Sequence, residues 1–282
     1  MSELNLLPEQ AYADLKTFLD GWVERTETPS YIETDPVLFM HAYEEKTDRE
    51  LAGFFAAIMA WGRRDIVISK VDDLLRRMDY RPADFIRNYE PSDQRHFRGF
   101  KHRTFKPVDI HWLVTILHRI LRRFGSFEAF WKECYRKAIT SGRELMGVFP
   151  EQFFALAPEA PRRTRKHISS ADRNSACKRL YLYLRWAVRS GSPVDTGIMS
   201  FMPPSELKIP LDVHVARQAR LLGLLDRKYN DWKATTALTA VLRRLDPGDP
   251  AKYDYALFGL GISEEQPPEK FLVNRQYAMG VN

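Results

Sequence analysis

The sequence predicts an all-α protein, and three observations lead to this class. Apolar residues recur with helical spacing along most of the chain. No segment shows sustained alternation of apolar and polar residues between turn signals, which is the pattern of a half-buried strand. Proline and glycine divide the chain into loops, and none of these is long or repetitive enough to be a flexible linker. We therefore expect a single globular unit over residues 1–282.

In the first half of the chain, two segments have apolar residues at clear helical spacing. Apolar residues over Leu51–Met59 follow the i, i+3, i+4, i+7, i+8 pattern, with Asp48 as a plausible start and Gly62 as a stop. The stretch Trp112–Ile120 repeats this pattern and ends at Gly125, after which a further helix begins. These segments account for most of the expected core in this half.

The second half is organised in the same way. Asp212 is the expected N-cap of a helix that stops at Gly223, and Asp231 is the expected N-cap of a helix that stops before Pro247. The intervening stretch Ser190–Pro210 is about twenty residues long, which is unusual for a loop unless it contains a helical turn or lines a site.

Composition limits the classes of function. The chain has 282 residues, of which 44% are hydrophobic, so it can bury a substantial core. It shows no basic-flanked apolar leader and no run of eighteen apolar residues, so we expect no membrane association and a cytoplasmic location. The two cysteines, Cys134 and Cys177, cannot form a disulfide framework or a four-thiolate site, so we expect no metal, no iron–sulfur cluster and no other cofactor.

Positive charge is concentrated in one segment. The net charge is +6, and Pro161–Ser190 alone carries nine Lys and Arg residues against the single acid Asp172. A phosphate backbone would favour such a block, although a solvated helix face would look the same. A second basic stretch, Arg95–Lys106, interleaves cations with aromatics that could stack on bases. An ordered loop anchored by those aromatics is the alternative interpretation.

Lys178 and Asp212 are the residues most indicative of chemistry. Lys178 opens an apolar run, and Asn174 is the expected N-cap of that helix. Imine formation needs a neutral amine, and a helix N-terminus flanked by Arg173 and Arg179 disfavours a further positive charge. A carboxylate held at a helix N-cap stays ionised, as stabilising a cationic sugar requires. A solvated surface lysine and a purely structural cap are the alternatives.

The surroundings of these two residues resemble a known superfamily. The stretch Ile209–Leu225, with Pro-Leu-Asp-Val-His-Val followed by Leu-Gly-Leu, resembles the helix carrying the essential aspartate in helix-hairpin-helix DNA glycosylases. Lys178 is similar to the lysine that begins an upstream helix in their bifunctional members. The two residues are 34 positions apart, which is closest to the archaeal 8-oxoguanine glycosylase branch. Phe54–Asp65 is similar to that fold's early helix and base-pocket loop, and Tyr253–Gly261 to its late small-residue helix.

Most of the chain also resembles the DUF2400 family of bacterial proteins. The matching stretches are Tyr31–Pro36, Ser175–Arg179, Leu184–Trp186, Pro210–Val215 and Leu257–Gly261.

The glycosylase resemblance implies a specific architecture. It implies two helical lobes with a cleft between them: a central lobe over 45–150, and a second lobe over 1–44 plus 151–282 that carries the catalytic helices. It also implies a helix-hairpin-helix-like element near Ile168–Arg173, but this stretch lacks the glycines that let backbone approach a phosphate. Ser169, Ser170 and Arg173 would then replace the backbone contacts, with Asp172 opposing them.

The resemblance further implies a DNA N-glycosylase and abasic-site lyase that removes a damaged base from flipped-out duplex DNA. Lys178 would attack the sugar and Asp212 would stabilise its cationic form; no protein partner is expected. For each tryptophan considered, core packing is the alternative to a pocket role. The expected phosphate contacts are Arg162, Arg163, Arg173 and Arg179, and the expected base-pocket residues are Trp61, Arg64 and Trp186.

Other functions remain open at this stage. A non-catalytic nucleic-acid-binding protein could keep the fold and the salt-dependent DNA affinity without cleaving any strand. A protein-interaction module could use the basic segment to meet an acidic partner. A monofunctional glycosylase could use Asp212 and water alone.

Overall fold

The computed structural model describes residues 9–263 and 265–273, and throughout them the regular structure is helical. These residues form no strand; extended pairing is limited to the isolated bridges His102–Phe105 and Ser175–Asp231. The predicted all-α class is confirmed. No helix in the described ranges is both long and apolar enough to span a membrane.

The helices follow one another through short connections. The α-helices are α1 (Glu9–Thr26), α2 (Pro29–Glu33), α3 (Leu38–His41), α4 (Lys46–Met59), α5 (Arg64–Arg76), α6 (Pro82–Arg87), α7 (Pro107–Phe124), α8 (Phe127–Ser141), α9 (Leu145–Ala155), α10 (Lys178–Val188), α11 (Val213–Leu221), α12 (Trp232–Leu245) and α13 (Tyr253–Ile262). The 3₁₀ helices are η1 (Pro91–Phe97), η2 (Thr164–His167), η3 (Ala171–Arg173), η4 (Pro204–Glu206), η5 (Pro250–Lys252) and η6 (Glu269–Phe271).

The predicted helix boundaries have recognisable caps. Gly125 ends α7 with φ +82°, a conformation that glycine adopts without steric cost, and Ser126 then begins α8 by accepting the Ala129 amide at 3.0 Å. Asp231 caps α12 by accepting the Ala234 amide at 3.0 Å. These helices therefore begin and end where their sequence signals predict.

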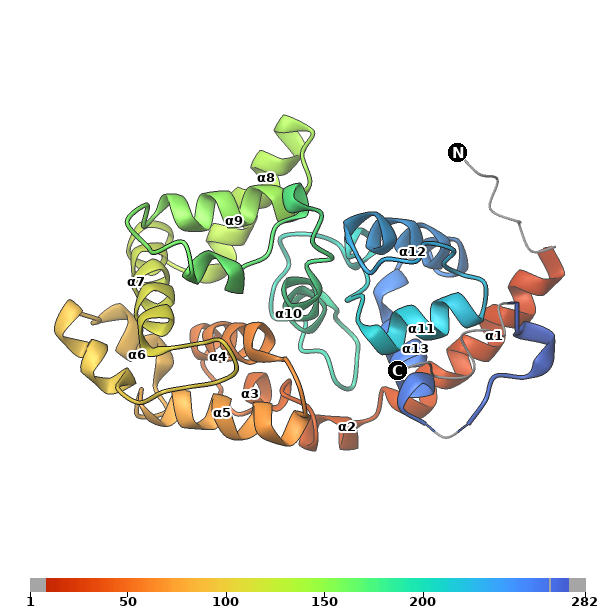
Figure 1. The fold of residues 1–282 in the computed structure, drawn as a ribbon, viewed down its shortest axis with the longest axis horizontal. Coiled ribbons are helices and arrows are strands. Elements are labelled where there is room, and N and C mark those ends of the chain that lie inside the picture. The colour runs from red at the N-terminus through yellow and green to blue at the C-terminus, as the bar shows by residue number, and fades with distance from the viewer. Residues whose placement is uncertain (1–8, 264, 274–282) are drawn as a thin grey trace.

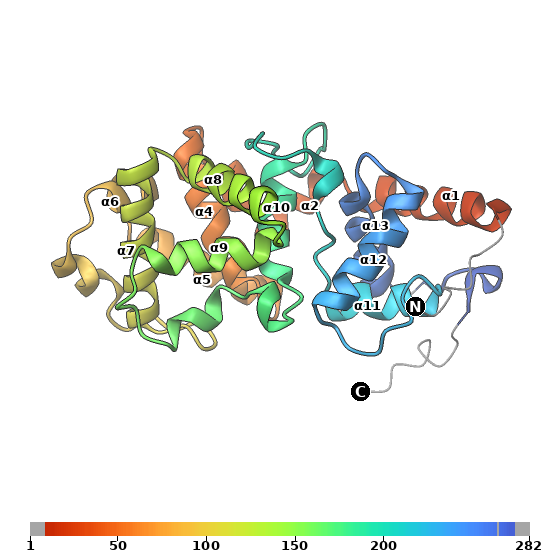
Figure 2. The ribbon, with the colours of Figure 1, turned by 90° about the horizontal axis from the view of Figure 1, so that it is seen from above.

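Two hydrophobic clusters form among the described residues. The first spans Val37–Leu207 with two later residues and is built on α3 to α10, at the left and centre of Figure 1. The second combines Leu15–Trp22 of α1 with apolar residues of Ile209–Leu260, at the right of Figures 1 and 2. Helix α10 packs in the first cluster. The two clusters therefore differ in their bounds from the lobes expected from the sequence, in which the first lobe ended at residue 150.

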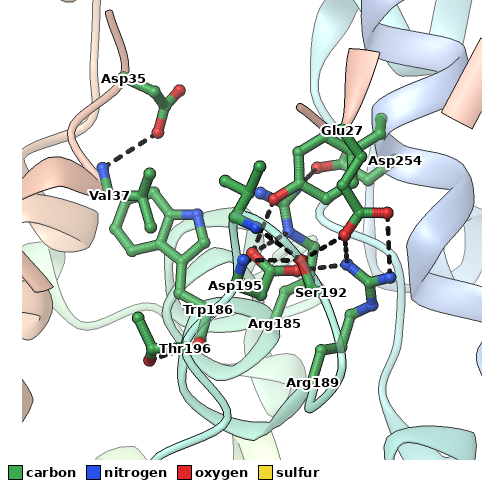
Figure 3. Close-up of polar contacts among 12 residues, drawn as sticks. Glu27, Asp35, Val37, Arg185, Trp186, Arg189, Ser192, Asp195, Thr196 and Asp254 are labelled. Carbon is green, nitrogen blue, oxygen red and sulfur yellow. Dashed lines mark hydrogen bonds and ion pairs between the residues drawn. The ribbon is translucent and has the colours of Figure 1, made fainter. Parts of the chain in front are cut away.

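Buried charges join the two clusters. Arg185 of α10 is 2% exposed and pairs with Asp254 of α13, and its Nε lies 3.4 Å from Oδ1 of Asp195 (Figure 3). The guanidinium also lies over the Tyr255 ring, at 4.0 Å from the ring centroid. Because each charge is removed from water, its pairing partner must be close and correctly oriented.

Asp195 lies in the long connection between α10 and α11. As its sequence suggested, this connection is irregular apart from the helical turn η4. Arginines at the C-terminal end of α10 hold it in place through Asp195. Arg189 pairs with Asp195 and, at 2.7 Å, with Glu27 just after α1 (Figure 3). It also contacts Asp249 at 2.9 Å. One buried arginine therefore ties the connection to the chain on both sides of it.

Helix α1 covers α13 at very close range. A Cβ atom at Gly259 would lie 2.2 Å from Oγ1 of Thr26, so the glycine is what allows this approach.

At about pH 8, where Asp254 is ionised, we expect Arg185→Met to lower the free energy of unfolding by about 3–5 kcal/mol, because it keeps the side-chain bulk but leaves Asp254 buried without its cation. Urea denaturation followed by circular dichroism measures this. Arg63→Ala is the matched control, since Arg63 is 78% exposed where it pairs with Asp65, and it should leave stability unchanged. Equal losses in the two variants would contradict a joining role for Arg185.

Candidate active site

Asp212 uses its two carboxylate oxygens for different purposes. Oδ1 accepts the Val215 amide at 2.8 Å, which confirms the predicted N-cap of α11. Oδ2 lies 3.4 Å from Nζ of Lys178. The side chain is 10% exposed and that of Lys178 is 36% exposed. The helix cap therefore fixes a carboxylate that faces an accessible amine.

Lys178 is the first residue of α10, and the expected N-cap at Asn174 is wrong. Cys177 occupies the N-cap position, with φ +50° and no capping side chain. The side-chain amide of Asn174 instead donates to Oδ2 of Asp231 at 3.0 Å, so this side chain does not cap α10. Asn174 also has a positive φ, of +56°. Left-handed conformations at non-glycine residues carry strain, which is common beside functional sites.

A cavity of about 1160 Å³ surrounds the pair, and both residues line it. Leu182 and Arg185 share this lining with Lys178, as the i, i+4, i+7 spacing on α10 allows. Asp254 and Phe258 contribute from α13 with i, i+4 spacing. Sequence analysis missed Leu182, Arg185, Asp254 and Phe258 as site residues, although this spacing relative to Lys178 and within Tyr253–Gly261 was a usable signal.

The cavity contains a buried carboxyl group besides Asp212. Burial raises the pKa of Asp254 to about 7, with Asp212 acting in the same direction and with Arg185 and Lys178 opposing. Asp254 can therefore hold a proton near neutral pH within the cavity. Burial also raises the pKa of Asp35, which Arg64 opposes from 3.1 Å.

The expected base-pocket residues differ in where they lie. Arg64 lines the cavity, with its guanidinium over the rings of Tyr31 and Phe258, each at 4.7 Å from the centroid. Trp61 lines it too and is 50% exposed. Trp186 is fully buried in the first hydrophobic cluster and does not line the cavity, so placing it in the pocket was wrong. Core packing, the alternative interpretation, describes Trp186 correctly.

The expected phosphate contacts also separate into two groups. Arg162 and Arg173 are exposed. Arg163 pairs with the buried Asp109 at 2.8 Å, and the Arg179 guanidinium donates to the carbonyl of Ile58. Burial lowers the pKa of Arg179 to about 10. Arg163 and Arg179 thus each donate to an acceptor inside the fold, and Arg179 also lines the cavity.

The region of the expected hairpin is not a pair of α-helices around a turn. Ile168–Arg173 lies between η2 and α10 and contains η3, so no α-helix directly precedes it. Ser170 caps η3 by accepting the Asp172 amide at 3.2 Å. Ser169 lines the cavity.

The aromatic residues in Arg95–Lys106 anchor this stretch. Phe97, Phe100 and Phe105 are at most 1% exposed, so the alternative interpretation of the stretch as an anchored loop is confirmed. These rings are not available for stacking on bases.

Comparison with known families agrees with one of the two resemblances. The family described as "Protein of unknown function (DUF2400)" has a family model that matches residues 35–263. The chain belongs to the DUF2400 family. The match includes Lys178, Asp212 and Asp254, and it leaves α1 and α2 outside. No curated protein and no solved structure matches the chain.

The raised pKa of Asp254 predicts a specific pH dependence of stability. The folded state keeps this proton up to about pH 7, while the unfolded chain releases it near 3.8, so the carboxyl lowers wild-type stability as pH rises between these values. The slope is at most about 1.4 kcal/mol per pH unit. Asp254→Asn has no such proton, so its unfolding free energy relative to wild type should increase across this window. A pH-independent difference in urea denaturation would contradict the assignment.

Proposed function

We propose that this protein is a DNA N-glycosylase and abasic-site lyase that removes a damaged base through an imine on Lys178. The observation that carries the proposal is the 3.4 Å separation of Lys178 Nζ and Asp212 Oδ2 at the wall of a cavity. An amine nucleophile beside a fixed carboxylate suits attack on a carbon that gains positive charge. A structural ion pair would not need such a cavity around it.

The cavity supports a substrate of nucleoside size. Its volume, about 1160 Å³, is slightly larger than the roughly 300–1,000 Å³ of typical small-molecule pockets, so a nucleoside fits within it. Leu182 and Phe258 offer apolar surface, while Arg185 and Asp254 offer polar groups in the same lining. A flat heterocycle needs this combination, since its faces are apolar and its edges form hydrogen bonds.

The proposed reaction follows from these positions. The neutral amine of Lys178 forms a bond to the anomeric carbon, and the glycosidic bond breaks with its electron pair leaving on the base, which takes up a proton. Asp212 stabilises the positive charge on the sugar during this exchange. The adduct nitrogen then gives up a proton and its lone pair forms the C=N bond of an imine, while the C1′–O4′ bond breaks with its electron pair leaving on O4′, which takes up a proton. Loss of a proton from C2′ then expels the 3′ phosphate and nicks the strand.

Phosphate contacts would come from the exposed cations near the cavity. Lys166 lines the cavity, and Arg162 and Arg173 are exposed in the same basic segment. Each phosphate contact releases counterions, so binding should weaken as salt concentration rises.

Borohydride trapping on abasic-site DNA tests the nucleophile. The native protein should give a covalent adduct, and Lys178→Ala should give none because no amine remains at the anomeric carbon. Lys132→Ala is the matched control, since Lys132 is an exposed lysine outside the cavity lining and this variant should be trapped as the native protein is. An undiminished adduct with Lys178→Ala would rule out the imine mechanism.

Asp212→Asn and Asp212→Ala separate the two roles of this carboxylate. Asparagine can still accept the Val215 amide, so stability should be kept while base release falls by about 100-fold or more. Alanine should lose the activity and also about 1 kcal/mol of stability. Single-turnover base release and thermal melting measure the two effects. Normal turnover in Asp212→Asn would mean that the carboxylate is only a cap.

A further inference from the structure

A buried arginine of α11 holds the connection between α11 and α12 in place. Arg220 is 6% exposed and donates from Nε to the carbonyl of Arg227 at 2.8 Å. Its Nη2 donates to the carbonyl of Lys228 at 2.9 Å and to Oδ1 of Asn230 at 2.6 Å. Two backbone carbonyls before Tyr229 and the side chain of Asn230 after it therefore share one buried guanidinium, which holds the connection on both sides of Tyr229.

The same connection is attached to the turn that precedes the candidate nucleophile. Asp231 accepts from Nε of Arg227 at 2.7 Å and from Asn174 at 3.0 Å, and it forms a bridge with Ser175. Lys178 follows that turn directly. The position of the connection is thus coupled to the position of the amine.

This ordered connection presents an aromatic ring to solvent. Tyr229 is 67% exposed, and Lys228 and Asn230 on either side of it are exposed as well. The guanidinium of Arg227 lies 6.0 Å from the ring centroid, and Asn230 lines the cavity. An exposed ring fixed beside cations at the edge of a cavity matches the way proteins stack on nucleobases next to a phosphate backbone.

We propose that Tyr229 stacks on a nucleobase left exposed in the duplex when the target nucleotide enters the cavity. This inference rests on the proposed function and adds a residue that holds the DNA open. The ring would replace part of the stacking that the duplex loses, and the exposed Lys228 would contact the adjacent backbone. A protein partner is disfavoured because the residues beside Tyr229, which are Arg227, Lys228 and Asn230, offer cationic and amide groups rather than apolar surface.

The test uses the full-length protein and a duplex with a reduced abasic site opposite 2-aminopurine. Anisotropy measures affinity, and 2-aminopurine fluorescence reports unstacking of the opposite base. Tyr229→Ala should bind about 5- to 100-fold more weakly with a smaller fluorescence change, while Tyr229→Phe should behave as wild type. Tyr80→Ala is the matched control, because Tyr80 is 46% exposed, lies outside the cavity lining and should have no effect.

The outcomes separate this inference from the proposed function. Thermal melting confirms that each variant is folded. If native protein binds and is trapped but Tyr229→Ala is indistinguishable from it, the stacking role is wrong and the glycosylase proposal stands. Equal weakening in the alanine and phenylalanine variants would also overturn stacking, since the ring is kept in the latter. Absence of native binding to the abasic duplex would overturn both.

Discussion

The buried pair between Arg185 and Asp254 is the constraint on which the site depends. Lys178 is carried by α10, which packs in the first hydrophobic cluster, whereas Asp212 caps α11 in the second cluster. Helix α11 packs against α13, so fixing α10 to α13 fixes the amine relative to the carboxylate. Separating the two partners would leave a buried charge uncompensated, at a cost of several kcal/mol, so the pair holds the two helices in one relative position. The 3.4 Å separation is therefore a property of the whole interface.

Local structure at the starts of α10 and α11 then fixes the orientation of Lys178 and Asp212. Because the Val215 amide holds one oxygen of Asp212, rotation of the carboxylate is restricted and the other oxygen stays directed at Lys178. On the other side, two residues with positive φ bring the chain into α10, so the lysine enters its helix from a tight turn rather than from a side-chain cap. The cap of α11 thus positions the carboxylate of Asp212, and the strained turn before α10 positions the amine of Lys178.

The all-α class, several helix boundaries and the cap at Asp212 could be predicted because each depends on residues close together in sequence. The pairing of Lys178 with Asp212 came from a resemblance and not from local pattern. The internal acceptors of Arg163 and Arg179, Asp109 and the Ile58 carbonyl, could not be predicted because they are 54 and 121 residues away. Charge counted along a segment cannot distinguish a cation that faces solvent from one that is already paired inside the fold.

The placement of α1 bears on how the chain can be divided. The family match begins at residue 35, yet Glu27 supplies one of the carboxylates around Arg189, and Thr26 fits against Gly259. A recombinant fragment trimmed to the matched region would uncover one side of α13 and take an anion away from a buried cation. Expression boundaries chosen from family alignment alone would thereby remove native contacts of α13 and Arg189, whereas retaining the preceding helix keeps them.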